Sequence, residues 1–198
     1  MERDELEAPS NWRDDARGWC AGRGWHWRAV VLLVLAWQAS IPFRDTEAFH
    51  VFRGITFGAH EFGHLFFAAI GGEWLAIAGG SLMQLLVPIG AAAIMRHYRD
   101  WFGVAACGLW LASSFADLAP YIADARALEL DLVSFSPDGG QHDWNYLLGK
   151  AGMLSSDLTV ARADRFVGFV VLVASVLFAA WLLRQMTQRM PDPGTRRS

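Results

Sequence analysis

One stretch of the chain, within the apolar run 55–70, carries most of the information, and it reads Ala59-His60-Glu61-Phe62-Gly63-His64. In this H-E-x-x-H pattern the two imidazoles are four residues apart, so on a helix they lie one above the other on the same face. Two histidines and a glutamate are costly inside an apolar helix unless they serve a purpose. The stretch therefore predicts an apolar helix whose polar face can hold a metal ion.

The spacing assigns a separate role to each polar residue. His60 and His64 can both ligate one zinc ion, which lowers the pKa of a bound water to about 7. Glu61 lies about 100° further round the helix, so it can reach that water without being a ligand and accept its proton. The alternative interpretation is structural, namely a helix with polar residues packed inside a bundle.

The composition indicates a membrane protein. Hydrophobic residues make up 54% of the chain, ten residues are Trp, and the mean hydropathy is +0.23. The net charge of -3 implies no nucleic-acid partner. Every basic residue except Lys150 is arginine, which is typical of GC-rich genomes. We expect an integral, multi-pass protein of a bacterial cytoplasmic membrane.

The apolar segments predict an all-α, multi-pass transmembrane helical bundle with four to five membrane segments. The candidates are residues 29–43, 45–72, 74–95, 101–122 and 166–183. Gly79-Gly80, Gln84 and Pro88 interrupt the third candidate, which favours a re-entrant or kinked element lining a cavity. Gly54 and Gly58 form a G-x-x-x-G pattern, which predicts that another helix approaches there.

Polar stretches divide the chain into three parts. Residues 1–28 are expected to be a polar N-terminal tail, 29–184 a membrane domain with a polar loop at 123–164, and 185–198 a C-terminal tail. Arginines occur before the first segment, at 96–99 and after the last segment. If the third segment is re-entrant, all three groups lie on the inner side of the membrane, as the positive-inside rule requires.

The third metal ligand must come from outside the helix, because a catalytic zinc site uses three protein ligands and a water. The polar loop offers Asp138, His142 and Asp143. His142 is the first expectation, because imidazole is a strong zinc ligand and the glycines before it let the backbone bend. Asp143 and Asp138 are the alternatives. Asp143 could instead orient His142 or cap the following helix.

Asp117 is an acid inside the fourth apolar segment. It can be an outer-shell partner that hydrogen-bonds a ligating histidine, as Asp143 also can. Alternatively, Asp117 lies near the membrane interface in contact with water.

The motif of residues 59–64, followed by Ala68 and Gly71, resembles the zinc-bearing helix of the site-2 protease family of intramembrane metalloproteases. Those proteins carry a later Asp-Gly-Gly motif whose aspartate is the third zinc ligand, and Asp138-Gly139-Gly140 is similar to it. The resemblance implies zinc as cofactor, peptide-bond hydrolysis within the membrane, Glu61 as general base and Asp138 as third ligand. In this chain a short amphipathic helix follows the glycines, where the family has a long apolar one.

These observations predict a zinc-dependent intramembrane peptidase that hydrolyses membrane-embedded substrates with a zinc-activated water. Its partners would be a membrane protein or peptide substrate and the lipid bilayer. The alternative is a non-hydrolytic metal-binding membrane protein, such as a sensor or a transport accessory.

Overall fold

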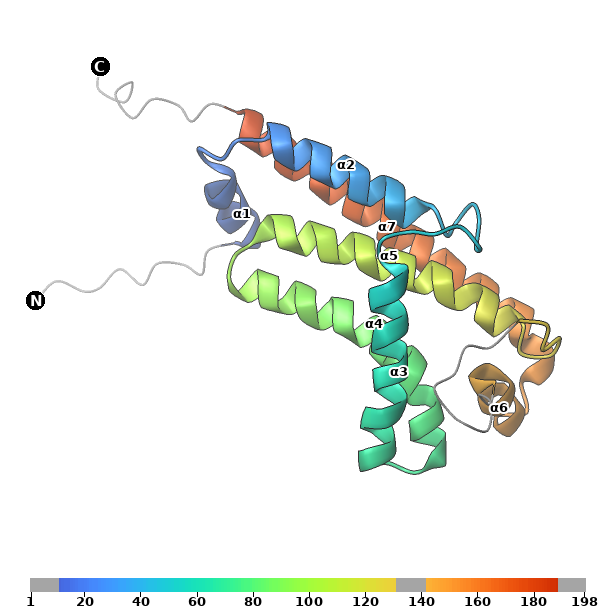
Figure 1. Cartoon of the computed structure of the whole chain (residues 1–198). Helices are drawn as coiled ribbons and strands as arrows, with labels where there is room; N and C mark the ends of the chain where they lie inside the picture. The colour runs from blue at the N-terminus through green and yellow to red at the C-terminus, as the bar shows by residue number, and fades with distance from the viewer. Residues whose placement is uncertain (1–10, 131–141, 189–198) are drawn as a thin grey trace, which may run out of the picture.

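The computed structural model describes residues 11–130 and 142–188, and all the regular structure in those ranges is helical (Figure 1). The elements in chain order are α1 (Trp12–Cys20), α2 (His26–Ser40), α3 (Arg53–Ile70), α4 (Glu73–His97), α5 (Trp101–Ala123), α6 (Asp143–Lys150), the 3-10 turn η1 (Leu154–Ser156) and α7 (Asp157–Thr187). This arrangement confirms the all-α prediction for the described part of the chain.

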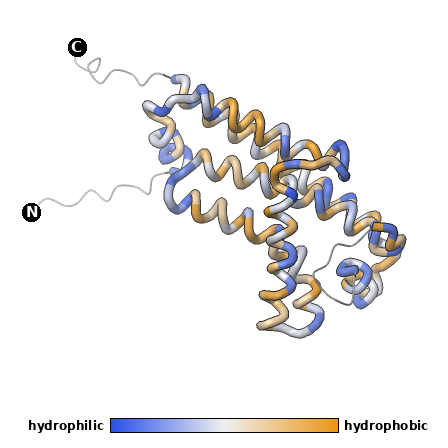
Figure 2. Tube along the Cα trace, in the orientation of Figure 1, coloured by the Kyte–Doolittle hydropathy of each residue, from blue (hydrophilic) through white to orange (hydrophobic). Residues whose placement is uncertain are grey.

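The long apolar helices form a bundle in which α5 packs along α7 and α4, and α2 lies against α5 and α7. Leu32, Leu109 and Leu182 are buried at the centre of this bundle. Hydrophobic residues predominate along these helices, and hydrophilic residues gather at their ends and in α6 (Figure 2). Within residues 11–130 and 142–188, three helical segments are long and apolar enough to cross a membrane: α4, α5 and residues 154–187.

The predicted first and second spans differ from these three. Helix α2 has 15 residues. Its length is therefore about 22 Å, which is shorter than the hydrocarbon core of a membrane at about 30 Å. Helix α3 crosses the bundle instead of running along it (Figure 1). It also begins at Arg53, later than the predicted residue 45, because Asp45 accepts the amides of Glu47 and Ala48 in a local turn.

Helix α4 is continuous from Glu73 to His97, so of the two predicted forms, re-entrant or kinked, the structure supports the kinked one. The helix changes direction along its length, pairing first with α3 and then with α5 (Figure 1). Pro88 lies inside it and is fully buried. Because proline lacks an amide hydrogen and its ring crowds the preceding turn, it accounts for a bend at this position.

Two glycines bring α3 and α4 into backbone contact. A Cβ atom on Gly79 would lie 2.7 Å from the carbonyl oxygen of Gly63, and one on Gly63 would likewise collide with Gly79. Among the residues that the structure describes, no helix makes the predicted G-x-x-x-G contact, because a Cβ on Gly54 or Gly58 would meet nothing within 4 Å. Gly79 therefore serves close helix packing and does not interrupt α4.

The predicted polar tail contains a packed helix. Trp12 of α1 lies against Trp101 and Trp181, with ring centroids 6.1 and 6.0 Å apart, and Asp15 lies 3.9 Å from Arg99. The sequence of α1 did not predict this contact, because the helix contains few apolar residues. The contacts gather α1, the α4–α5 turn and the end of α7 at the same end of the bundle (Figure 1).

This arrangement leads to a topology prediction. Reporter domains fused after residue 99 and after residue 188 should both report the side of the membrane on which α1 lies, because the three positions share one end of the bundle. Cytoplasmic reporter activity at both fusion points is the expected result. Opposite locations for the two fusions would contradict the arrangement of α4, α5 and α7 as crossing helices.

Candidate metal centre

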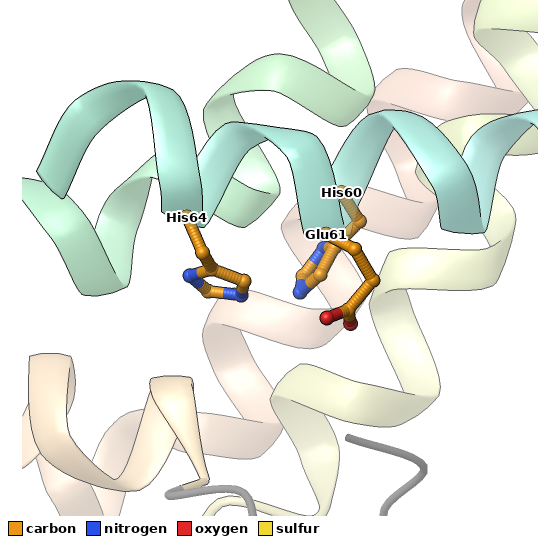
Figure 3. A group of neighbouring side chains, drawn as sticks. All are labelled: His60, Glu61 and His64. Atoms are coloured by element: carbon orange, nitrogen blue, oxygen red, sulfur yellow. The ribbon is translucent and has the colours of Figure 1, made fainter. Parts of the chain in front are cut away.

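Three polar side chains of α3 project from the same side of the helix, as Figure 3 shows. They are His60, Glu61 and His64, and one ligand atom from each lies within 4.8 Å of the others. The helical spacing produces this grouping. His60 and His64 are four residues apart and share a face, and Glu61 directly follows His60. The structure thus brings together the three residues of the H-E-x-x-H motif.

Asp143, the first residue of α6, meets both imidazoles from the opposite side. Its Oδ2 atom lies 3.1 Å from Nε2 of His60 and 3.3 Å from Nε2 of His64. The exposed fractions of the side chains are 7% for Asp143, 12% for His60 and 28% for His64. The site is therefore largely enclosed and is most accessible beside His64.

The other nitrogen of each imidazole faces an oxygen. Nδ1 of His60 lies 3.0 Å from Oε1 of Gln84, and Nδ1 of His64 lies 2.9 Å from the carbonyl oxygen of Ala76. Both partners belong to α4. A proton on each Nδ1 satisfies these oxygens, so in the neutral imidazoles, the form that can bind a metal, the two Nε2 lone pairs are directed toward Asp143.

Two imidazole nitrogens and a carboxylate oxygen form a donor set that suits zinc and leaves a fourth position for water or substrate. Three lone-pair donors this close together repel one another unless positive charge, either protons or a metal ion, lies between them. Without a metal ion, protons on the two Nε2 atoms supply that positive charge. Burial raises the pKa of Asp143, but the hydrogen bonds that His60 and His64 donate in this protonated form outweigh burial and hold that pKa below its ordinary value. The aspartate is therefore kept in the charged form that a metal ion needs.

The structure changes the order of the third-ligand candidates. His142 was the first expectation, but it is the N-cap of α6, and its Nδ1 atom accepts the amide of Asn145. Its Nε2 atom lies 3.3 Å from the carboxylate of Asp124. Adjacent residues at a helix start point in different directions, so of these two neighbours it is Asp143 that reaches the histidine pair. Asp138 lies outside the residues that the structure describes.

Several hydrogen bonds hold Asp143 in place. The amide of Asp143 donates to the hydroxyl of Tyr121 at 2.9 Å, and the side chain of Asn145 donates to the carbonyl of Ala125 at 2.7 Å. The indole of Trp144 donates to the hydroxyl of Ser81 at 3.1 Å. Helix α6 is thereby fastened to both α5 and α4.

Asp117 does not contact the metal-site histidines. Its Oδ1 atom lies 3.0 Å from Nε2 of His50, a fully buried residue ahead of α3. The prediction that Asp117 supports a ligating histidine is therefore replaced by a separate buried His–Asp pair. The side chain that hydrogen-bonds the Nδ1 atom of His60 is instead that of Gln84. In the sequence, a polar glutamine inside an apolar segment was the feature that could have indicated this role.

Comparison with known proteins gives no relative for this chain. No protein-family model, curated protein or solved structure matches it. The chemistry proposed below therefore depends on the geometry of these residues.

Gly80 leads to a prediction about the site. A Cβ at this position would lie 2.6 Å from Nε2 of His60 and would collide with the ring of His64 as well. We expect Gly80→Ala to displace both ligand atoms and to weaken zinc affinity by about 10–100-fold or more. Gly90→Ala is the matched control on the same helix, because its Cβ would meet nothing within 4 Å. Equal zinc affinities for the two variants, measured by chelator competition, would contradict the close approach of Gly80.

Proposed function

We propose that the protein is a zinc-dependent intramembrane peptidase. The observation that carries the proposal is the convergence of His60, His64 and Asp143, with Nε2-to-Oδ2 distances of 3.1 and 3.3 Å. The three apolar segments that could cross a membrane support the setting. Glu61 supports hydrolysis over simple metal binding, because a carboxylate beside the ligands supplies a base.

Each residue has a distinct task in this mechanism. His60, His64 and Asp143 would hold the metal ion. A bound zinc ion would act as a Lewis acid that makes water more acidic and stabilises negative charge on the carbonyl oxygen of the substrate. Glu61 takes the proton from the attacking water and delivers it to the nitrogen of the leaving amine. Helices α4, α5 and α6 enclose most of the site, which is most accessible beside His64.

The surface beside the motif favours an apolar peptide substrate. Phe62 and Leu65, which flank the ligands on α3, have exposed fractions of 55% and 73%. The more exposed ligand, His64, adjoins this apolar surface. A membrane-embedded chain can reach the site along it, provided that the chain unwinds so that a peptide carbonyl enters.

Zinc content tests the proposal directly. Purified wild-type protein should carry about one zinc per chain, and His64→Ala should lose most of it because two protein ligands hold zinc poorly. His97→Ala is the matched control, since His97 is exposed at the end of α4, away from the site. Metal-free wild-type protein after zinc-replete expression would overturn the proposal.

A further inference from the structure

Gln84 is a buried amide at the point where three helices meet. It belongs to α4, has an exposed fraction of 5%, and contacts α3 on one side and α5 on the other. It precedes Pro88 by four residues, so its backbone carbonyl lacks the amide that would normally bond to it. A polar side chain in this apolar position needs a specific reason.

The contact with α5 fixes the orientation of the amide. Nε2 of Gln84 donates to the carbonyl oxygen of Ser114 at 2.8 Å. Because a carbonyl oxygen can only accept, the NH₂ group must face Ser114, and the amide oxygen must face the other way. That oxygen lies 3.0 Å from Nδ1 of His60.

The orientation of the amide then determines the tautomer of His60. Oε1 of Gln84 has no hydrogen to give, so the contact is a hydrogen bond only when Nδ1 of His60 carries the proton. Nε2 is then the nitrogen with a free lone pair, and it is the one that faces Asp143. We propose that Gln84 is a positioning residue for metal binding: anchored by Ser114, it holds His60 in the ligating tautomer and ring orientation. This inference rests on the proposed zinc site.

His64 provides an internal reference, because its Nδ1 atom is held by the backbone carbonyl of Ala76, which no side-chain substitution removes. Gln84→Met keeps the approximate shape and removes the acceptor. Gln84→Glu keeps an acceptor for His60 but loses the NH₂ group that donates to Ser114. Thr56→Val is the control for packing, since it removes two other buried α3–α5 contacts, from Trp110 at 2.9 Å and with the hydroxyl of Ser114 at 3.4 Å, and leaves the contact between Gln84 and His60 in place.

Two measurements on the full-length protein test the proposal. In chelator competition with zinc alone, Gln84→Met should bind about 10–100-fold more weakly than wild type, the cost typical of losing an outer-shell partner. Thr56→Val should stay within a few-fold of wild type, and Gln84→Glu, which keeps the acceptor but loses the anchor to Ser114, should fall between wild type and Gln84→Met. By NMR of ¹⁵N-histidine-labelled protein, Gln84→Met should lose the slowly exchanging Nδ1 proton of His60 and retain that of His64.

The outcomes separate this inference from the proposed function. If Gln84→Met retains both the zinc affinity and the His60 Nδ1 signal of wild type, the role of Gln84 is overturned while the zinc site stays intact. Equal weakening in Gln84→Met and Thr56→Val would show a general packing effect and would also overturn it. Absence of zinc binding in wild type would overturn the proposed function, and the Nδ1 signal of metal-free protein would still decide whether Gln84 orients His60.

Discussion

Glu61→Gln is expected to retain its zinc and to lose peptide cleavage by about 10²–10⁴-fold, the usual contribution of a general base. Glutamine has nearly the shape of glutamate but accepts no proton at neutral pH. The ligands His60, His64 and Asp143 are unchanged, so metal binding should persist. The measurement is cleavage of a labelled transmembrane test peptide by purified protein, with zinc content determined on the same samples.

Glu47→Gln is the matched control, because it makes the same isosteric change at an exposed position in the turn before α3. It should cleave at the wild-type rate. If Glu61→Gln also cleaves at that rate, Glu61 is not the base and the mechanism fails. If neither the variant nor the wild type cleaves membrane-embedded peptides although both hold zinc, the non-hydrolytic metal-binding protein becomes the better explanation.

Asp143→Ala is expected to weaken zinc affinity by more than the roughly 10–100-fold that loss of an outer-shell partner costs. The carboxylate that lies between the two imidazoles is removed, and only His60 and His64 remain as ligands. Chelator competition with zinc measures the change. The substitution should leave α6 in place, because the backbone amide that donates to Tyr121 is retained.

His142→Ser is the paired variant for this prediction. Serine is a good N-cap residue, so α6 keeps its cap while the imidazole is lost. Zinc affinity should stay close to wild type, since the ring of His142 pairs with Asp124. The reverse result, with zinc lost in His142→Ser and retained in Asp143→Ala, would return the third-ligand role to His142.

The grouping of His60, Glu61 and His64 could be predicted because it depends only on the spacing of residues along a single helix. The membrane character of the chain could be predicted from its composition for a similar reason. The first and last residues of the helices were harder to predict, because local hydrogen bonds determine them. Asp45 has the side chain of a helix cap, yet its hydrogen bonds close an isolated turn and α3 begins at Arg53.

The partners of the motif helix could not be predicted, because they depend on how distant segments meet. His142 and Asp143 are neighbours in the chain, and their chemistry favoured the histidine. At the start of α6 the two side chains point in different directions, and it is the aspartate that points toward the site. Gly79, Gly80 and Gln84 looked like interruptions of an apolar segment, whereas they provide the contacts through which α4 supports α3.

The proposed ligands belong to two elements that are far apart in sequence, since His60 and Asp143 are separated by 83 positions. A metal ion shared by α3 and α6 would thus act as a removable cross-link, and its binding free energy would add to the free energy of folding. Zinc at 100 times its dissociation constant would contribute about 2.7 kcal/mol to that folding free energy. The melting temperature would then rise with zinc concentration, and a chelator would lower it to the value of the metal-free protein.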